Sequence, residues 1–178
     1  MPQTLLALAA ICLFGVVAFN QQQADADVET DAISLAADLA AADLAEERMA
    51  EILLAYAWDE EDTGWTVLRT APPASGIGPD HNADGNETDP SLFDDVDDFD
   101  GLVTTHDRPA GTGTLAFEAT VRVGFVDPAA PDGPPSPTPT LAKRVEVSVA
   151  EVGARGRRGA TVQLRRVATS ADHDPHRR

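Results

Sequence analysis

The sequence has 178 residues, which leaves room for one modest hydrophobic core once a long N-terminal helix is set aside. Its 30 acidic residues outnumber 13 lysines and arginines, giving a net charge of −17, and this balance disfavours nucleic-acid binding. The single cysteine, Cys12, excludes an intramolecular disulfide framework.

The chain opens with an apolar run, Thr4–Phe19, that contains no charged residue and no proline. At about 1.5 Å per residue it reaches about 24 Å, against about 30 Å of hydrocarbon in a bilayer, so Gln3 and Asn20–Gln23 would lie at the two interfaces. We expect residues 1–19 to form a single transmembrane helix in the cytoplasmic membrane, with the C-terminal domain extracytoplasmic. The alternative is a cleaved signal peptide, since Val16–Ala18 fits a small-residue cleavage site.

An amphipathic continuation of this helix is expected over residues 20–62. Apolar residues recur at a seven-residue interval, at Val28, Leu35, Ala42, Met49 and Tyr56. Further apolar residues fill in the same stripe, namely Leu39, Ala45, Ile52 and Leu53. The segment Leu44–Trp58 is expected to pack on a folded domain. The helix is predicted to end near Asp59–Gly64, where acids crowd its C-terminal end and a glycine follows.

Residues 63–113 are predicted to be a loop region that contains an acidic segment. Trp65–Arg69 is a short strand candidate, and the stretch after it, up to Pro90, is rich in turn residues. In Phe93–Leu102, apolar residues at a spacing of three alternate with acids. This spacing predicts that Phe93, Val96 and Phe99 face a core while the aspartates remain in water.

Within that region, a candidate metal site matches the first half of a calcium-binding loop. Its oxygen-bearing residues alternate around Gly85, and they are Asp80, Asn82, Asp84 and Asn86. The position where a glutamate usually closes the cage is Ser91, so an acid such as Asp89, Asp94 or Asp95 would have to replace it. Calcium is the one cofactor that the sequence suggests, and a solvated turn rich in Asp and Asn is the alternative.

An antiparallel sheet is predicted over residues 114–168. The clearest strand is Leu115–Val126, in which apolar and polar residues alternate with a period of two. Two further strands are marked by inward-facing apolar residues, namely Val145, Val147 and Val149, then Val162 and Leu164. The proline-rich connection Pro128–Pro139 is expected to be stiff and extended. Residues 169–178 are predicted to be a disordered basic tail.

A helix with one apolar stripe and a sheet with one apolar face can cover each other. We therefore predict an α+β fold, with a long N-terminal helix packed on a small antiparallel sheet. The histidines and serines fall in no nucleophile or metalloprotease motif, and the sequence has no phosphate-binding glycine loop. We therefore do not expect an enzyme.

The order of these parts resembles type IV pilins and the pseudopilins of type II secretion. Two stretches carry the resemblance: Thr4–Leu8 with its apolar continuation, and Phe93–Gly101, FDDVDDFDG. The second is similar to an aspartate-rich segment in minor pilins of the mannose-sensitive haemagglutinin type. The family's basic leader, its Gly-Phe cleavage point and its early glutamate find no match here. Leader processing and N-methylation are therefore not carried over to this chain.

The resemblance implies a pilin-like fold and a structural or accessory subunit of a type IV pilus-like or type II secretion-like assembly, including a cell-surface filament. Its partners would be the membrane and other pilin-like subunits. Apolar N-terminal helices bundle in such filaments, so the expected assembly residues are Leu5, Leu6, Leu8, Ile11, Leu13, Phe14 and Phe19. The alternative is a monomeric membrane-anchored or secreted acidic domain that binds a ligand or calcium.

Overall fold

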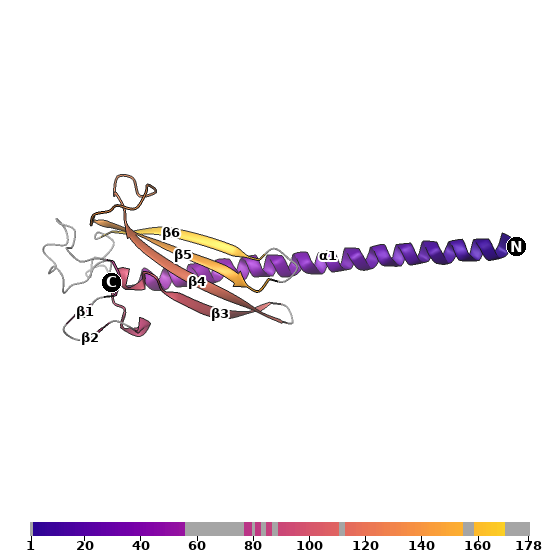
Figure 1. Cartoon of the computed structure of the whole chain (residues 1–178), viewed down its shortest axis with the longest axis horizontal. Helices are drawn as coiled ribbons and strands as arrows, with labels where there is room; N and C mark the ends of the chain where they lie inside the picture. The colour runs from indigo at the N-terminus through magenta and orange to yellow at the C-terminus, as the bar shows by residue number, and fades with distance from the viewer. Residues whose placement is uncertain are drawn as a thin grey trace.

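The computed structural model describes residues 2–55, 77–79, 81–82, 85–86, 89–110, 113–154 and 159–169, with the backbone alone described for 2–10 and for the residues of 81–86. A long helix, α1 (Pro2–Ile52), packs on a four-stranded antiparallel sheet, with a two-stranded hairpin nearby (Figure 1). The predicted α+β class is confirmed.

Helix α1 is a single uninterrupted rod, because the segment has one glycine and no proline after its first residue. It ends at Ile52, earlier than the predicted end near Asp59. At Leu54 and Ala55 the backbone hydrogen bonds join residues three positions apart instead of four. The N–H of Leu54 donates to the carbonyl of Glu51 at 3.1 Å, which ends the α-helical ladder. Tyr56, Trp58 and the strand candidate Trp65–Arg69 lie outside the described residues.

The C-terminal third of α1 contacts the sheet, while its N-terminal part projects well beyond it (Figure 1). The buried residues follow a spacing of three and four, and they are Ala37, Ala41, Leu44, Ala45, Met49 and Ile52. The prediction that Leu44–Trp58 packs on a folded domain is thus confirmed for Leu44, Ala45, Met49 and Ile52, whereas Leu53 and Leu54 are 40% and 71% exposed. Val28, Leu35 and Leu39, which lie in the same stripe but before that segment, have exposed fractions of 69%, 62% and 59%. Small alanines, rather than these larger residues, let the helix backbone approach the sheet.

The sheet has the strand order β3-β4-β5-β6, with strands β3 (Val103–Ala110), β4 (Gly113–Phe125), β5 (Ala142–Val152) and β6 (Thr161–Thr169). Every neighbouring pair is antiparallel, so the predicted meander of the last three strands is confirmed. Strand β3 is a correction, because it lies in the predicted loop region. Its proline, Pro109, is tolerated because β3 is an edge strand that needs hydrogen bonds on one side only.

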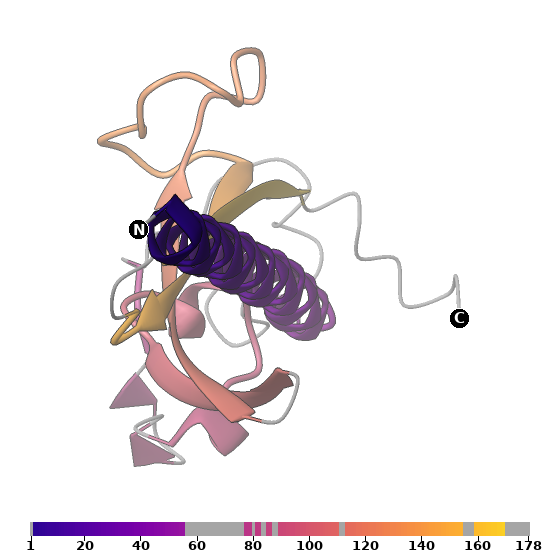
Figure 2. The ribbon, with the colours of Figure 1, turned by 90° about the vertical axis from the view of Figure 1, so that its right-hand side faces the viewer.

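The hydrophobic core lies between α1 and one face of the sheet (Figure 2). The predicted alternation is confirmed in β4 and β5, whose buried core residues are Phe117, Ala119, Val121, Val123, Phe125, Val145, Val147 and Val149. Facing pairs in the ladder, such as Val121 with Val147, place apolar side chains next to one another. Burying one such side chain is worth about 1.5–3 kcal/mol, so this face fixes the register of the strands.

The acidic segment folds into two short 3-10 helices, Pro90–Leu92 and Asp97–Phe99, and then joins the sheet. Gly101 has a φ of 79°, a left-handed conformation that a glycine adopts without strain. This turn directs the chain along β4, where Gly101 N–H donates to Val121 O at 3.1 Å and Val121 N–H donates to Leu102 O at 2.9 Å. The segment is thereby held against the end of the core.

Candidate functional site

The projecting part of α1 exposes large apolar side chains. Among the expected assembly residues, Ile11, Leu13, Phe14 and Phe19 have exposed fractions of 71%, 67%, 77% and 60%. Leu5, Leu6 and Leu8 lie on the helical backbone, but their side chains are outside the described residues. Val16 and Val17 add to the same surface. We call residues 2–30 of α1 the stem, and the rest of the described structure the head.

Apolar residues surround the stem on all sides between Ile11 and Phe19. Successive residues of an α-helix are rotated by about 100°, so the exposed side chains of Ile11, Leu13 and Phe14 point in different directions. A helix that is apolar all round is normally covered by protein or lipid. Within the described part of the chain, no helix carries an apolar stretch long enough to cross a bilayer.

A second site is built around Lys143, the only lysine in the sequence. Lys143 lies on the core-facing side of β5, in line with Val145 and Val147, and is 2% exposed. Its Nζ atom contacts Oδ1 of Asp97 and lies 3.3 Å from Oδ2 of Asp95. Both aspartates are buried as well. The charge of the lysine is thus met by carboxylates inside the protein, as burial of an ion requires.

The acids of this segment also fold its backbone. The carboxylate of Asp98 accepts hydrogen bonds from the backbone N–H groups of Asp94 and Asp95, at 3.0 and 3.1 Å. Asp95 Oδ1 in turn accepts the N–H of Asp97 at 2.7 Å. The prediction that the aspartates remain in water is therefore wrong for Asp95, Asp97 and Asp98, which are buried, and holds for exposed Asp94.

The apolar half of the same prediction is confirmed. Val96 and Phe99 are buried in the core, and Phe93 packs against it. The rings of Phe93 and Phe99 meet edge to face, with centroids 5.1 Å apart, a favourable geometry for an aromatic pair. The buried lysine was missed from sequence. Its signal was present, because position 143 is inward in the alternation that Val145 and Val147 define, and an inward lysine requires acidic partners.

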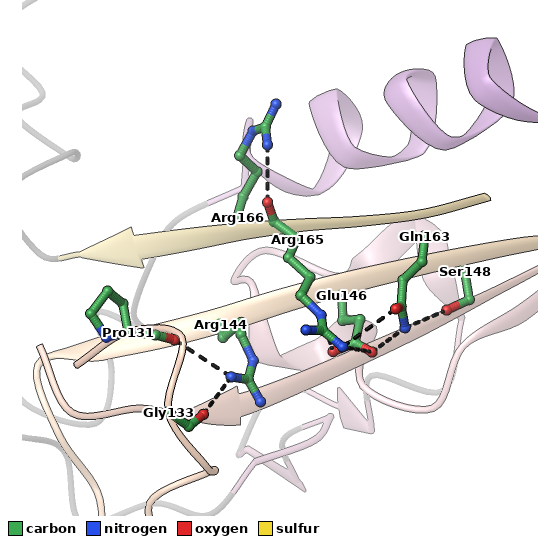
Figure 3. A network of polar contacts seen from close by, with 8 residues as sticks. All are labelled: Pro131, Gly133, Arg144, Glu146, Ser148, Gln163, Arg165 and Arg166. Atoms are coloured by element: carbon green, nitrogen blue, oxygen red, sulfur yellow. Dashed lines mark hydrogen bonds and ion pairs between the residues drawn. The ribbon is translucent and has the colours of Figure 1, made fainter.

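On the face of the sheet away from α1, a cavity of about 360 Å³ lies beside the proline-rich connection. Its charged lining residues are Asp100, Arg122, Arg144 and Glu146, and Pro135 contributes an apolar wall. The Arg144 guanidinium donates to the carbonyl oxygen of Gly133 at 2.8 Å, which fixes the connection over the sheet (Figure 3). The cavity thus presents both signs of charge to a small polar ligand.

Polar side chains also link β5 to β6 on this outer face (Figure 3). Arg165 Nε donates to Glu146 Oε2 at 3.1 Å, and Gln163 Nε2 donates to Ser148 Oγ at 3.3 Å. These pairs are cross-strand neighbours in the ladder. Because they are exposed, each contributes modestly to stability, on the order of 0.2–1 kcal/mol.

A polar contact joins α1 to the edge strand β3. Arg108 of β3 forms an ion pair with Glu47 of α1, and His106 is partly buried beside them. Burial lowers the pKa of His106 below its ordinary value, and the positive charges of Arg48 and Arg108 lower this pKa further. The neutral form of the imidazole is therefore the one that the folded protein favours.

The candidate calcium ligands are only partly placed. Asn82 and Asn86 lie in β1 (His81–Asn82) and β2 (Gly85–Asn86), which pair as a hairpin, whereas Asp80 and Asp84 lie outside the described residues. Of the acids that would close the cage, Asp89 accepts the N–H of Ser91 at 2.9 Å. This hydrogen bond is the main cause that lowers the pKa of Asp89. Calcium binding stays a prediction.

Comparison with known proteins finds no family model, no curated protein and no solved structure that matches this chain.

Proposed function

We propose that this chain is a structural, non-catalytic subunit of a filament-like assembly of the type IV pilus or type II secretion kind. The stem would lie in the cytoplasmic membrane before assembly and would then pack against the stems of other pilin-like subunits. The head would remain extracytoplasmic. Minor or accessory positions in such an assembly, including a cell-surface filament, fall within this proposal.

The observation that carries the proposal is the exposed apolar stem. The 51 residues of α1 extend about 77 Å at 1.5 Å per residue, and from Ile11 on, where side chains are described, the first buried residue of the helix is Ala37. Covering one exposed Leu or Phe is worth about 1.5–3 kcal/mol, so several of them supply a strong drive for association. Stems that bundle satisfy this drive while the heads stay in water.

The acidic residues that follow the apolar part of the stem support a defined boundary between the part of α1 in the membrane and the part outside it. Asp25, Asp27, Glu29 and Asp31 are exposed on α1 directly after it. A charged side chain in hydrocarbon costs about 2.5–3.5 kcal/mol, so these acids would stay outside the membrane. They would also space the heads away from the lipid surface.

The test uses the full-length protein in membranes of its source cells, extracted with mild detergent. We expect it in a complex with further copies or with other proteins that carry a long N-terminal helix. Replacing Phe14 by Glu should release a monomer, because a charge enters the bundle. Leu92 is a matched control, since it is 56% exposed but lies on the head, so Leu92→Glu should leave the complex intact.

Two outcomes would contradict the proposal. The first is a native N-terminus that begins after Ala18, which would show that the apolar segment is removed during export. The second is a wild-type protein that is monomeric in the extract and keeps its full stem.

The second candidate is a monomeric membrane-anchored or secreted domain that binds a ligand or calcium. The observation that favours it is the outer-face cavity of about 360 Å³ with charges of both signs. Calcium titration by calorimetry tests the ion-binding form of this candidate. Uptake of calcium that is lost in Asp84→Ala would support it, whereas heat changes equal in the wild type and the variant would exclude this loop.

A further inference from the structure

Lys143, Asp95 and Asp97 form a triad of one amine and two carboxyl groups inside the protein. Their side chains are only 2%, 6% and 8% exposed. Lys143 Nζ contacts Asp97 Oδ1 and lies 3.3 Å from Asp95 Oδ2, so both carboxyl groups reach the same nitrogen. These are the components of a condensation reaction, held together where water has little access.

Burial changes the chemistry that such a triad can perform. A low-dielectric environment favours the neutral forms of an amine and a carboxyl group over their ions. A proton passed from Lys143 to Asp97 converts the ion pair into a neutral amine beside a neutral carboxylic acid. The neutral amine is a nucleophile, as in enzymes whose lysine is desolvated. Permanent contact corresponds to an effective concentration of about 10⁵–10⁸ M in well-oriented pairs.

We propose that Lys143 and Asp97 become joined by an amide bond that the folded protein forms without an enzyme. The lone pair of Nζ attacks Cγ of Asp97, and an N–C bond forms. Asp95 accepts the proton that the nitrogen loses and passes it to the departing hydroxyl group. The Cγ–O bond breaks and one water molecule leaves. No oxidant, activated precursor or cofactor is required, because an amine hydrogen and a carboxyl hydroxyl combine as water.

The surroundings of the triad favour the bonded state. Val96 is buried between the two aspartates in sequence, and buried Val126 donates its N–H to the carbonyl of Ala142, the residue before Lys143, at 3.0 Å. Phe125 is the ladder partner of Lys143 and is also buried. Apolar groups on these sides exclude the water that would hydrolyse the amide.

The bond would link the acidic segment to β5 across 46 positions of sequence. A covalent link of this kind restricts the unfolded chain, as a disulfide does. With only one cysteine, this chain has no internal disulfide to serve that purpose. The inference is independent of assembly, and it would hold equally for a monomeric domain.

The test is made on the purified, folded full-length protein by mass spectrometry. We expect an intact mass lower than that calculated from the sequence by one water molecule. Lys143 is the only lysine, so after denaturation an amine-reactive reagent should label the α-amino group alone. Proteolysis should release a branched peptide in which Lys143 is joined to Asp97.

Two substitutions separate the proton relay from the fold. Asp95→Asn removes the relay while keeping a similar shape, so this variant should retain its full calculated mass and a Lys143 that reacts with the reagent. Asp94→Asn is the matched control, because Asp94 is exposed on the same segment. This control should still lose one water molecule.

Three results would overturn the proposal. The first is a wild-type protein with the full calculated mass. The second is labelling of Lys143 in the denatured wild type. This would also expose water loss through a succinimide at an Asp-Gly sequence, which leaves the lysine free. The third is a branched peptide through Asp95, which would reverse the assigned roles. The wild-type measurements do not depend on whether any variant folds.

Discussion

The aspartates of the acidic segment have different structural roles, because each one contacts a different partner. Asp98 accepts two backbone N–H groups, whereas Asp97 contacts Nζ of Lys143. Asp100 turns the other way and accepts the N–H of Val123 at 2.7 Å. Val123 lies in β4 beyond the last residue paired with β3, so a side chain takes the place of a neighbouring strand there.

Replacing Asp100 by Ala should therefore destabilise the head. The N–H of Val123 would lose its acceptor in a partly buried place, which costs about 1–3 kcal/mol. The free energy of unfolding, measured by urea denaturation, should fall by that amount. Asp127→Ala is the control, because Asp127 accepts an exposed N–H from Ala129, and it should change the value by less than about 0.5 kcal/mol. Equal effects of the two substitutions would contradict this role for Asp100.

His106 should make the stability of the head depend on pH. Its pKa in the folded protein is lowered from 6.5 by burial and by Arg48 and Arg108. As the pH falls below about 6.5, the unfolded chain takes up a proton before the folded one does, so stability decreases. The decrease ends once the pH passes below the folded pKa.

The measurement is the melting temperature of the wild type and of His106→Gln between pH 7.5 and about pH 5. The melting temperature of the wild type should fall by more than that of the variant as the pH is lowered through this window. The other titratable groups are common to both proteins and give both curves the same remaining pH dependence. Parallel curves for the two proteins would show that His106 titrates normally in the folded state.

At the scale of elements, α1 carries two apolar surfaces, and periodicity alone does not say which one the sheet covers. Val28, Leu35 and Leu39 lie on one surface, and the sheet packs on the other, which contains Ala37, Ala41 and their neighbours. Shape decides the outcome, because small side chains allow the helix and a valine-rich sheet to approach closely. That fit is a property of the pair and not of either sequence segment.

The two surfaces of α1 can be told apart by paired substitutions. Leu44→Ala removes a fully buried side chain and should lower the free energy of unfolding by about 2–5 kcal/mol. Leu39→Ala makes the same chemical change five positions earlier, where the side chain is 59% exposed, and should alter it by less than about 0.5 kcal/mol. Chemical denaturation of both variants checks this, and similar losses would place Leu39 in the core.

The strands differ in how clearly their sequences predict them. In β4 and β5 the apolar residues alternate with polar ones, since one face is buried and the other is wet, and both strands were predicted. Strand β3, VTTHDRPA, lies at the edge and buries little, so it carries no such signal. The pairing of Lys143 with Asp97 spans 46 positions and depends on the finished fold. Local pattern therefore predicted β4, β5 and β6, and it missed the edge strand β3 and the buried ion pair.

At the scale of the molecule, the stem and the head differ in whether their apolar side chains take part in the hydrophobic core. In the described residues the hydrophobic core involves α1 only from Ala37 onward, and all of its residues belong to the head. From Ile11 on, where its side chains are described, the stem leaves its large apolar side chains exposed. The head is thus expected to fold without the stem, while the stem requires lipid or other helices.

Deleting residues 1–24 tests this division of labour. The shortened helix would begin near Asp25 and Asp27, whose negative charges favour a helix N-terminus. It would keep every buried residue of α1. We expect the free energy of unfolding of the truncated protein, measured by thermal denaturation, to match that of the full-length protein within about 0.5 kcal/mol. Sedimentation should show a monomer in water without detergent, because the apolar surface that drives association has been removed.

A truncated protein that fails to fold would mean that the stem contributes to the stability of the head. One that still associates would move the assembly surface from the stem to the head.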